Sequence, residues 1–267
     1  GKKKLYFKMS NLEILQPLSC VAGKSEQLFR MLDNTTGRDK ITKTIQYALK
    51  IAVWHTEKDP SNAKFKIFHN NVSSARRCFR MGKFGIGYVA LYRYLESLLN
   101  NSQKDPYYNG LATLQKLILS TYLGYDTLNW FTGFKLLPDE PQFWSAFATQ
   151  GNAPTYKARG NKLWCLASLL GLILSVWVLY RKYESYQRFV LESKHEDESI
   201  QKEARIQKVK LMKSIPKDLR GFVKNLMDFL VSSSFSGYWD TNQGVIGTMG
   251  MISAIVAGYD IWFKYEK

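Results

Sequence analysis

Apolar residues along the chain gather into runs and stripes with helical spacing. The clearest run, residues 163–180, contains eighteen residues without a charge, and Lys162, Arg181 and Lys182 flank it. As a helix this run would be roughly 27 Å long, close to the ~30 Å hydrocarbon core of a bilayer. Basic side chains at both ends can reach the two interfaces, so the pattern predicts a membrane span. The alternative is a buried helix of a soluble protein.

A second uncharged run covers residues 241–259, with its apolar part beginning at Gly244, and Asp260, Trp262 and Phe263 follow it. An aspartate is tolerated at a membrane interface, so a second, weaker span is predicted near residues 244–263. Both runs carry a small residue at every fourth position: Ala167, Gly171 and Ser175 in the first, and Gly250, Ala254 and Gly258 in the second. Small residues let two helices approach closely in lipid, which predicts helix pairing within or between chains. The alternative is the generally raised glycine and alanine content of membrane helices.

The rest of the chain also has helical periodicity. Ile41, Ile45 and Leu49 share a stripe behind a predicted cap and first turn at Thr36 to Asp39. No run alternates long enough for a sheet. The predicted class is therefore all-α: a helical membrane protein with N-terminal amphipathic helices and one or two transmembrane helices.

The patterns divide the chain into two regions. Residues 1–137 form a predicted N-terminal amphipathic helical region, and residues 138–267 a membrane-anchoring region. Between the two spans lies a predicted charged loop, residues 181–240, with helical stretches that Pro216 is expected to interrupt.

The segment from residue 72 to residue 89 has the strongest separation of charge and apolar surface. On a helical wheel its basic residues share one arc: Arg76, Arg77, Arg80 and Lys83. The apolar residues occupy the opposite arc: Ala75, Cys78, Phe79, Met81, Ile86 and Val89. Three glycines make this helix marginal in water, so we expect it to fold on a surface. A basic face opposite a bulky apolar face is typical of a helix that inserts into a membrane interface.

The charge balance supports an acidic partner. The chain of 267 residues has 38 Lys plus Arg against 22 Asp plus Glu, a net charge of +16. Anionic phospholipid membranes and nucleic acids both attract such a chain. No helix-turn-helix, zinc-finger or RNA-recognition signature is present, so we predict a membrane partner and no nucleic acid. For residues 72–89 the alternative is a soluble bundle helix with a solvated basic face.

Motifs for catalysis are missing from the sequence. It contains no GxSxG, Walker A or GxGxxG pattern. His55, His69 and His195 stand alone without a second metal ligand at helical spacing. We therefore predict neither an enzyme nor a metal or other cofactor.

Two stretches together resemble the peroxin eleven family of peroxisomal membrane proteins. They are LDNTTGRDKITKTIQYALKI (Leu32 to Ile51) and SSARRCFRMGKF (Ser73 to Phe84), in the order that the family has them. Further matches are YLGYDTLNWF, the apolar run ending in YRKY, VKNLMDFLV, and the glycine-rich segment that closes on Trp262. The resemblance therefore covers most of the chain.

The resemblance implies a role in shaping the peroxisomal membrane. In the family an amphipathic helix inserts into the cytosolic leaflet, the proteins self-associate, and the peroxisome elongates before a dynamin-related GTPase divides it. It implies that Arg76, Arg77, Arg80 and Lys83 bind lipid headgroups, and that Phe79, Met81 and Ile86 wedge between acyl chains. The small-residue stripes would then provide homo-oligomer contacts. An oligomeric solute channel of the same membrane is the alternative function.

Overall fold

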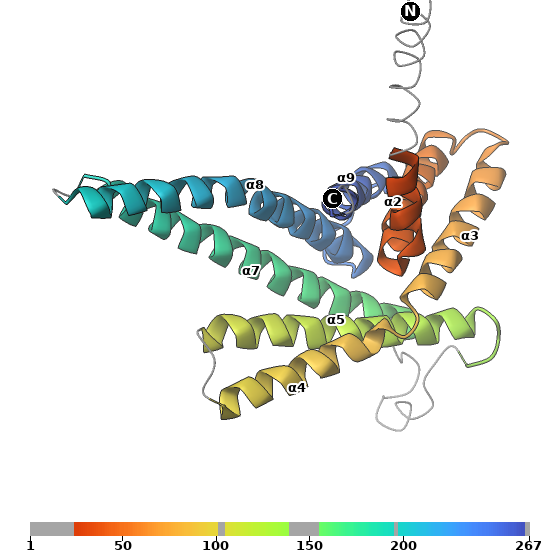
Figure 1. Cartoon of the computed structure of the whole chain (residues 1–267). Coiled ribbons are helices and arrows are strands. Elements are labelled where there is room, and N and C mark those ends of the chain that lie inside the picture. The colour runs from red at the N-terminus through yellow and green to blue at the C-terminus, as the bar shows by residue number, and fades with distance from the viewer. Residues whose placement is uncertain (1–23, 101–104, 139–154, 195–196, 265–267) are drawn as a thin grey trace, which may run out of the picture.

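The computed structural model describes residues 24–100, 105–138, 155–194 and 197–264 (Figure 1). These residues form helices and no strand, which confirms the all-α class. The elements in chain order are α2 (Thr35–His55), α3 (Asn62–Arg80), the short 3-10 helix η1 (Lys83–Gly85), α4 (Ile86–Leu99), α5 (Pro106–Thr132), α7 (Tyr156–Glu192), α8 (Glu198–Phe235) and α9 (Gln243–Trp262). His195 lies outside the described residues.

Two of these helices, α7 and α9, are long and apolar enough to cross a membrane. They contain the two runs that the sequence predicts as spans. At 37 residues, α7 continues well past the apolar run into charged sequence. The side chain of Asn242 caps the start of α9 by accepting a hydrogen bond from the Val245 amide.

The expected continuous helix over residues 72–89 is interrupted in the structure. Helix α3 ends at Arg80, and α4 begins at Ile86 after the single turn of η1. The break falls at Gly82, whose φ of 81° lies in the left-handed region that glycine adopts readily. The amphipathic segment is therefore two helices joined at a glycine.

The predicted charged loop between the spans contains the helical stretches that were expected, and helix occupies most of it. The residues after the first apolar run extend α7 to Glu192, and most of the remaining residues form α8. Pro216 lies inside α8 and does not end it. Proline removes one backbone hydrogen bond and bends a helix, and the axis of α8 changes direction along its length (Figure 1).

The two halves of the chain pack on each other. Helix α5 lies between α4 and α7, and α2 packs on both α9 and α3. Helix α8 contacts α7 and α9, so it joins the two candidate spans. The α4–α5 contact is close because Gly87 has no side chain: a Cβ there would approach the Lys116 carbonyl oxygen to 2.6 Å. The Gly87 amide also donates to the Ser120 hydroxyl at 2.7 Å.

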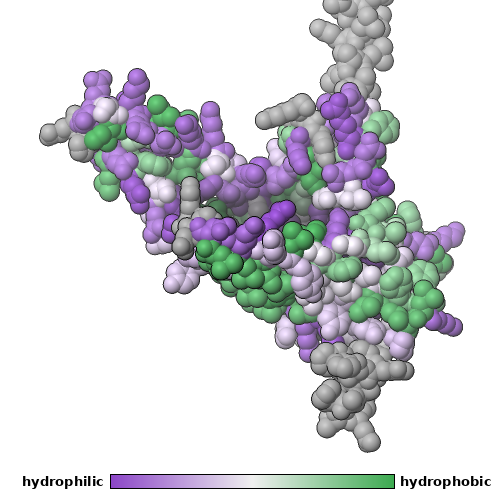
Figure 2. Space-filling view, turned by 60° about the horizontal axis from the view of Figure 1, so that its bottom comes forward, coloured by the Kyte–Doolittle hydropathy of each residue, from purple (hydrophilic) through white to green (hydrophobic). Residues whose placement is uncertain are grey.

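The polarity of this bundle differs from that of a water-soluble protein. Its most buried side chains include Asp39, Lys43, Arg76 and several serines, whereas long apolar side chains face outward on every long helix. Figure 2 shows broad hydrophobic regions on the face that lies at the bottom of Figure 1. Membrane proteins turn ionisable groups toward the bundle interior and expose apolar groups to lipid. The distribution of side chains thus fits a bundle that is partly in contact with lipid.

Candidate functional site: a polar cavity and an outer apolar surface

A cavity of about 500 Å³ lies between α2, α3, α5, α7 and α8. Its lining contains nine basic side chains: Lys40, Lys43, Lys50, Arg76, Arg77, Arg80, Lys83, Lys157 and Lys224. Three carboxylates line it as well: Asp39, Asp126 and Asp228. We refer to this space as the polar cavity. Among the described residues no group of three or more His, Cys, Asp or Glu side chains is placed to hold a metal.

Asp39 of α2 pairs with basic residues of two helices. Its Oδ1 lies 3.3 Å from Arg76 Nε and 4.0 Å from Arg80 Nε, and its Oδ2 lies 3.1 Å from Lys40 Nζ. Burial raises the pKa of Asp39, but the positive charges of Arg76, Lys40 and Arg80 outweigh burial and hold that pKa well below its ordinary value. Asp39 is therefore an ionised group that fixes α3 against α2.

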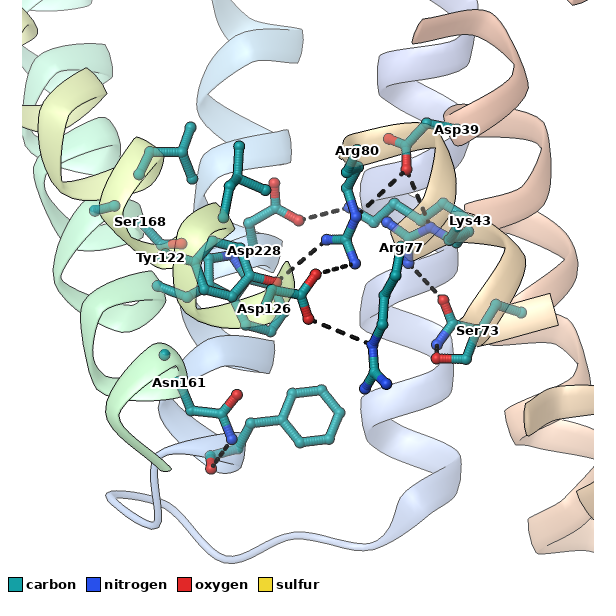
Figure 3. A pocket seen from close by; sticks show the side chains of 18 of the residues that line it. Asp39, Lys43, Ser73, Arg77, Arg80, Tyr122, Asp126, Asn161, Ser168 and Asp228 are labelled. Carbon is teal, nitrogen blue, oxygen red and sulfur yellow. Dashed lines mark hydrogen bonds and ion pairs between the residues drawn. The ribbon is translucent and has the colours of Figure 1, made fainter. Parts of the chain in front are cut away.

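Asp126 of α5 pairs with the next two arginines of α3. Arg80 Nη2 lies 2.7 Å from Asp126 Oδ2, and Arg77 Nε lies 3.4 Å from Asp126 Oδ1. Arg80 also donates to the Tyr122 hydroxyl at 3.2 Å. Figure 3 shows Arg77 and Arg80 pointing toward Asp126 across the space between the helices. Arg80 thus links carboxylates of α2 and α5.

Asp228 of α8 forms the third ionic cluster. Lys43 Nζ lies 2.8 Å from Asp228 Oδ1 and also 2.8 Å from the Ser253 hydroxyl of α9. Lys224 Nζ lies 3.3 Å from Asp228 Oδ2. Burial raises the pKa of Asp228, but Lys43 and Lys224 outweigh that effect and lower it. The cluster ties α2, α8 and α9 together.

The structure turns the predicted headgroup arginines toward these carboxylates. Arg76 is only 8% exposed, and Arg77 and Arg80 hold Asp126. Lys83 lies half-buried on η1 and lines the same cavity. The helical wheel places the four side chains on one face, and in the structure that face points into the bundle. Headgroup binding by these residues stays a prediction, and for the three arginines it would compete with their internal ion pairs.

The predicted insertion residues lie on the opposite, outer side. Ala75 and Met81 are exposed, Phe79 is half-buried, and Ile86 and Val89 are 58% and 51% exposed. Exposed apolar side chains continue this surface along α3 and α4: Ile67, Phe68, Phe84, Tyr88, Tyr92, Leu95 and Leu99. We call these residues, together with Met81, Ile86 and Val89, the outer apolar surface.

The small-residue stripes lie mostly at contacts within the chain. Ala167 is fully buried, and Asn225 of α8 donates to the Gly171 carbonyl at 3.0 Å and to the Ser175 hydroxyl at 2.6 Å. In the second stripe a Cβ on Gly250 would lie 2.2 Å from the Tyr47 ring, and Ala254 is fully buried. Gly258 has open space around it. Contacts of these stripes between chains stay a prediction.

The polar side of α2 was absent from the sequence interpretation. The predicted apolar stripe contains Ile45, which is exposed, whereas Asp39, Lys43 and Tyr47 are buried. A signal was present, because these three polar residues recur at every fourth position and continue to Lys50. Their partners on α3, α5 and α8 lie far away in the sequence and give no local signal.

Comparisons with known proteins extend the sequence resemblance. The family model described as Peroxisomal biogenesis factor 11 matches residues 25–262. Peroxisomal membrane protein PMP30B of Candida boidinii is 22% identical over 88% of this chain and 93% of its own length. Peroxisomal biogenesis factor 11 of Schizosaccharomyces pombe is 20% identical over the same shares. Peroxisomal membrane protein 11B of Arabidopsis thaliana is 30% identical, over 40% of this chain and 45% of its own length. No solved structure matches this chain.

Proposed function

The chain belongs to the Peroxisomal biogenesis factor 11 family and is a peroxisomal membrane protein of peroxisome biogenesis, and on this premise we propose that it curves and elongates that membrane. Elongation would promote proliferation and fission of the organelle. Self-association and recruitment of a fission machinery with a dynamin-related GTPase are further parts of the proposal, and they rest on the family resemblance alone.

The outer apolar surface is the observation that carries this proposal. Helix α4 packs on α5 through Gly87 and leaves Ile86, Val89, Tyr92 and Leu95 exposed. Moving one CH₂ group of such a side chain from water into an apolar environment is favourable by about 0.8 kcal/mol. A surface of this size therefore favours insertion between the headgroups and the acyl chains of the membrane. The proposed inserting element is therefore the α3–η1–α4 unit and not one continuous helix.

Insertion of this unit would bend the membrane through unequal leaflet areas. A helix lying ~5–10 Å deep occupies area in one leaflet and none in the other. The internal ion pairs of Asp39 and Asp126 hold α3 against α2 and α5, so the wedge would act as part of a rigid bundle. Anionic phospholipids would add attraction through the net charge of +16.

Reconstitution into vesicles tests the proposal. The full chain should convert spherical vesicles that contain anionic phospholipid into tubules, as seen by electron microscopy. The variant I86E/V89E should insert normally through α7 and α9 and yet form far fewer tubules, because two carboxylates on the outer apolar surface oppose its burial in lipid. Both native side chains are exposed, so the substitutions leave the interior of the bundle unchanged.

The matched control is L191E/V209E. Leu191 and Val209 are 69% and 55% exposed on the α7–α8 pair, away from the outer apolar surface. This control adds the same two charges and should tubulate vesicles as the native chain does. Tubulation by I86E/V89E at the native level would contradict the proposed role of the α3–η1–α4 unit.

A second candidate function, an oligomeric solute channel, is favoured by the polar cavity. A space of about 500 Å³ lined by charged side chains inside a lipid-surrounded bundle is a place where polar solutes could reside. Single-channel current across a planar bilayer distinguishes the two candidates. Membrane curving alone predicts no current, whereas a channel predicts discrete steps.

A further inference from the structure

The polar cavity holds more positive than negative charge. Its three carboxylates pair, within 4.0 Å, with six of the nine basic side chains. The remaining three, Lys50, Lys83 and Lys157, form no ion pair within the described part of the chain. The internal carboxylates thus leave a positive excess inside the cavity.

Part of this excess positive charge is concentrated in one part of the polar cavity. Lys50 of α2 lies with its Nζ 4.8 Å from the centre of the Phe235 ring, so it is held among α2 and α8 residues. Lys157 of α7 and His69 of α3 line the same cavity, where the charge of Lys157 lowers the pKa of Lys50 and the charge of Lys50 lowers that of His69. Three helices therefore bring three nitrogen groups to one part of the cavity.

Lys50 is partly buried without an ion-pair partner among the described residues, and one nitrogen of His69 is buried without a hydrogen-bond partner. Burial lowers the pKa of Lys50 to about 8, and the positive charge of Lys157 acts in the same direction. His69 Nε2 is buried and has no hydrogen-bond partner among the described residues. A buried cation beside a like charge costs free energy unless an anion compensates it. An anion between these groups would therefore stabilise them.

We propose that the polar cavity is a binding site for a phosphate-bearing anion, held between Lys50 and Lys157 with His69 Nε2 beside it. A phosphate group fits because it carries up to two negative charges and several acceptor oxygens, which can meet donors from different helices at once. The phosphate could belong to a soluble compound or to a phospholipid headgroup. The site does not depend on membrane curving, because its residues line the polar cavity and do not belong to the outer apolar surface.

Binding to the purified full chain tests this site. The chain is placed in nanodiscs of phosphatidylcholine and titrated with inorganic pyrophosphate, with thermal unfolding and the fluorescence of Trp164, which lines the cavity, as the readouts. In a second arm, nanodiscs with and without phosphatidic acid are compared. Saturable pyrophosphate binding assigns the site to a soluble phosphate, and stabilisation by phosphatidic acid alone assigns it to a headgroup.

Variants connect either signal to the cavity. K50Q/K157Q should weaken the binding signal by about tenfold or more, since two charged donors are lost. K157Q alone should weaken it too and is the safer variant, because Lys157 is exposed and its loss spares the Lys50–Phe235 contact. The matched control K202Q/K210Q removes the same charge from exposed positions of α8 and should bind as the native chain does. The proposal is overturned if neither probe binds, or if K157Q and K50Q/K157Q bind like the control.

Discussion

The two sides of α3 are the reverse of what a helix in a soluble protein shows: the charged side faces the interior and the apolar side is exposed. The inner side carries Arg76 and Arg80 against Asp39 and Asp126, whereas the outer side exposes Ile67 and Phe68. Ion pairs organise the interior, and apolar side chains form the surface. The difference teaches that amphipathicity alone does not tell which face of a helix is buried, because the surroundings decide it.

Among the changes considered, removal of the Asp39 carboxylate from the inner side of α3 should lower the free energy of unfolding the most. In D39N, Arg76 and Arg80 lose a buried anion, and breaking a buried pair by removing one partner costs about 3–5 kcal/mol. We expect the free energy of unfolding in detergent to fall by that amount. The double variant D39N/R76Q should recover part of the loss, because one uncompensated charge is removed. Equal losses in the single and double variants would show that Asp39 acts without Arg76.

Two glycines of α9 give a second comparison with a smaller expected effect, because one is tightly packed and the other has open space around it. A Cβ at Gly250 would overlap the buried Tyr47 ring, whereas Gly258 has nothing within 4 Å. Overpacking costs about 1–3 kcal/mol, so G250A should destabilise the bundle. G258A should stabilise it by up to ~1 kcal/mol, because alanine is the better helix former. Thermal unfolding of the two variants checks the sign of each change, and equal responses would contradict the packing of α9 on α2.

The partial burial of Lys50 predicts a pH dependence. Its pKa is about 8 in the folded chain and 10.5 ordinarily, so between these values the unfolded chain binds more protons. The native chain should therefore gain stability over K50M as pH rises from 8 to 10.5, with a slope of at most about 1.4 kcal/mol per pH unit. Lys157, whose charge acts on Lys50 from another helix, and the neighbouring His69 are present in both proteins. If the free energies of unfolding of the native chain and of K50M changed in parallel with pH, Lys50 would be solvated in the folded chain.

The outer apolar surface should give the smallest change in folding stability. Ile86 and Val89 are both more than half exposed, so the variant I86S/V89S should alter the free energy of unfolding in detergent by less than about 0.5 kcal/mol per site. Vesicle tubulation should weaken in the same variant, because apolar area available to lipid is lost. A large loss of stability would indicate that these side chains are buried in the folded chain, against the contrast drawn above.

Much of this architecture follows from local pattern. The two spans could be predicted because a long uncharged run fits few structures other than a membrane or core helix. The basic arc of residues 76–83 could be predicted because it depends only on the spacing of neighbouring residues in one helix. The break at Gly82 was indicated by three glycines, which the sequence interpretation treated as a weakness of one helix. Glycine at a left-handed φ is the physical reason that two helices form.

The sequence by itself determined the helical class, which side chains share a face of a helix, and that two helices can cross a membrane. Only the tertiary structure decided that the arginine face of α3 turns inward, because Asp39 and Asp126 lie 37 and 46 positions from Arg76 and Arg80 along the chain and no local pattern joins them. It also decided that Lys50, His69 and Lys157 share one cavity. Periodicity is a property of one helix, whereas charge compensation and cavities arise between helices.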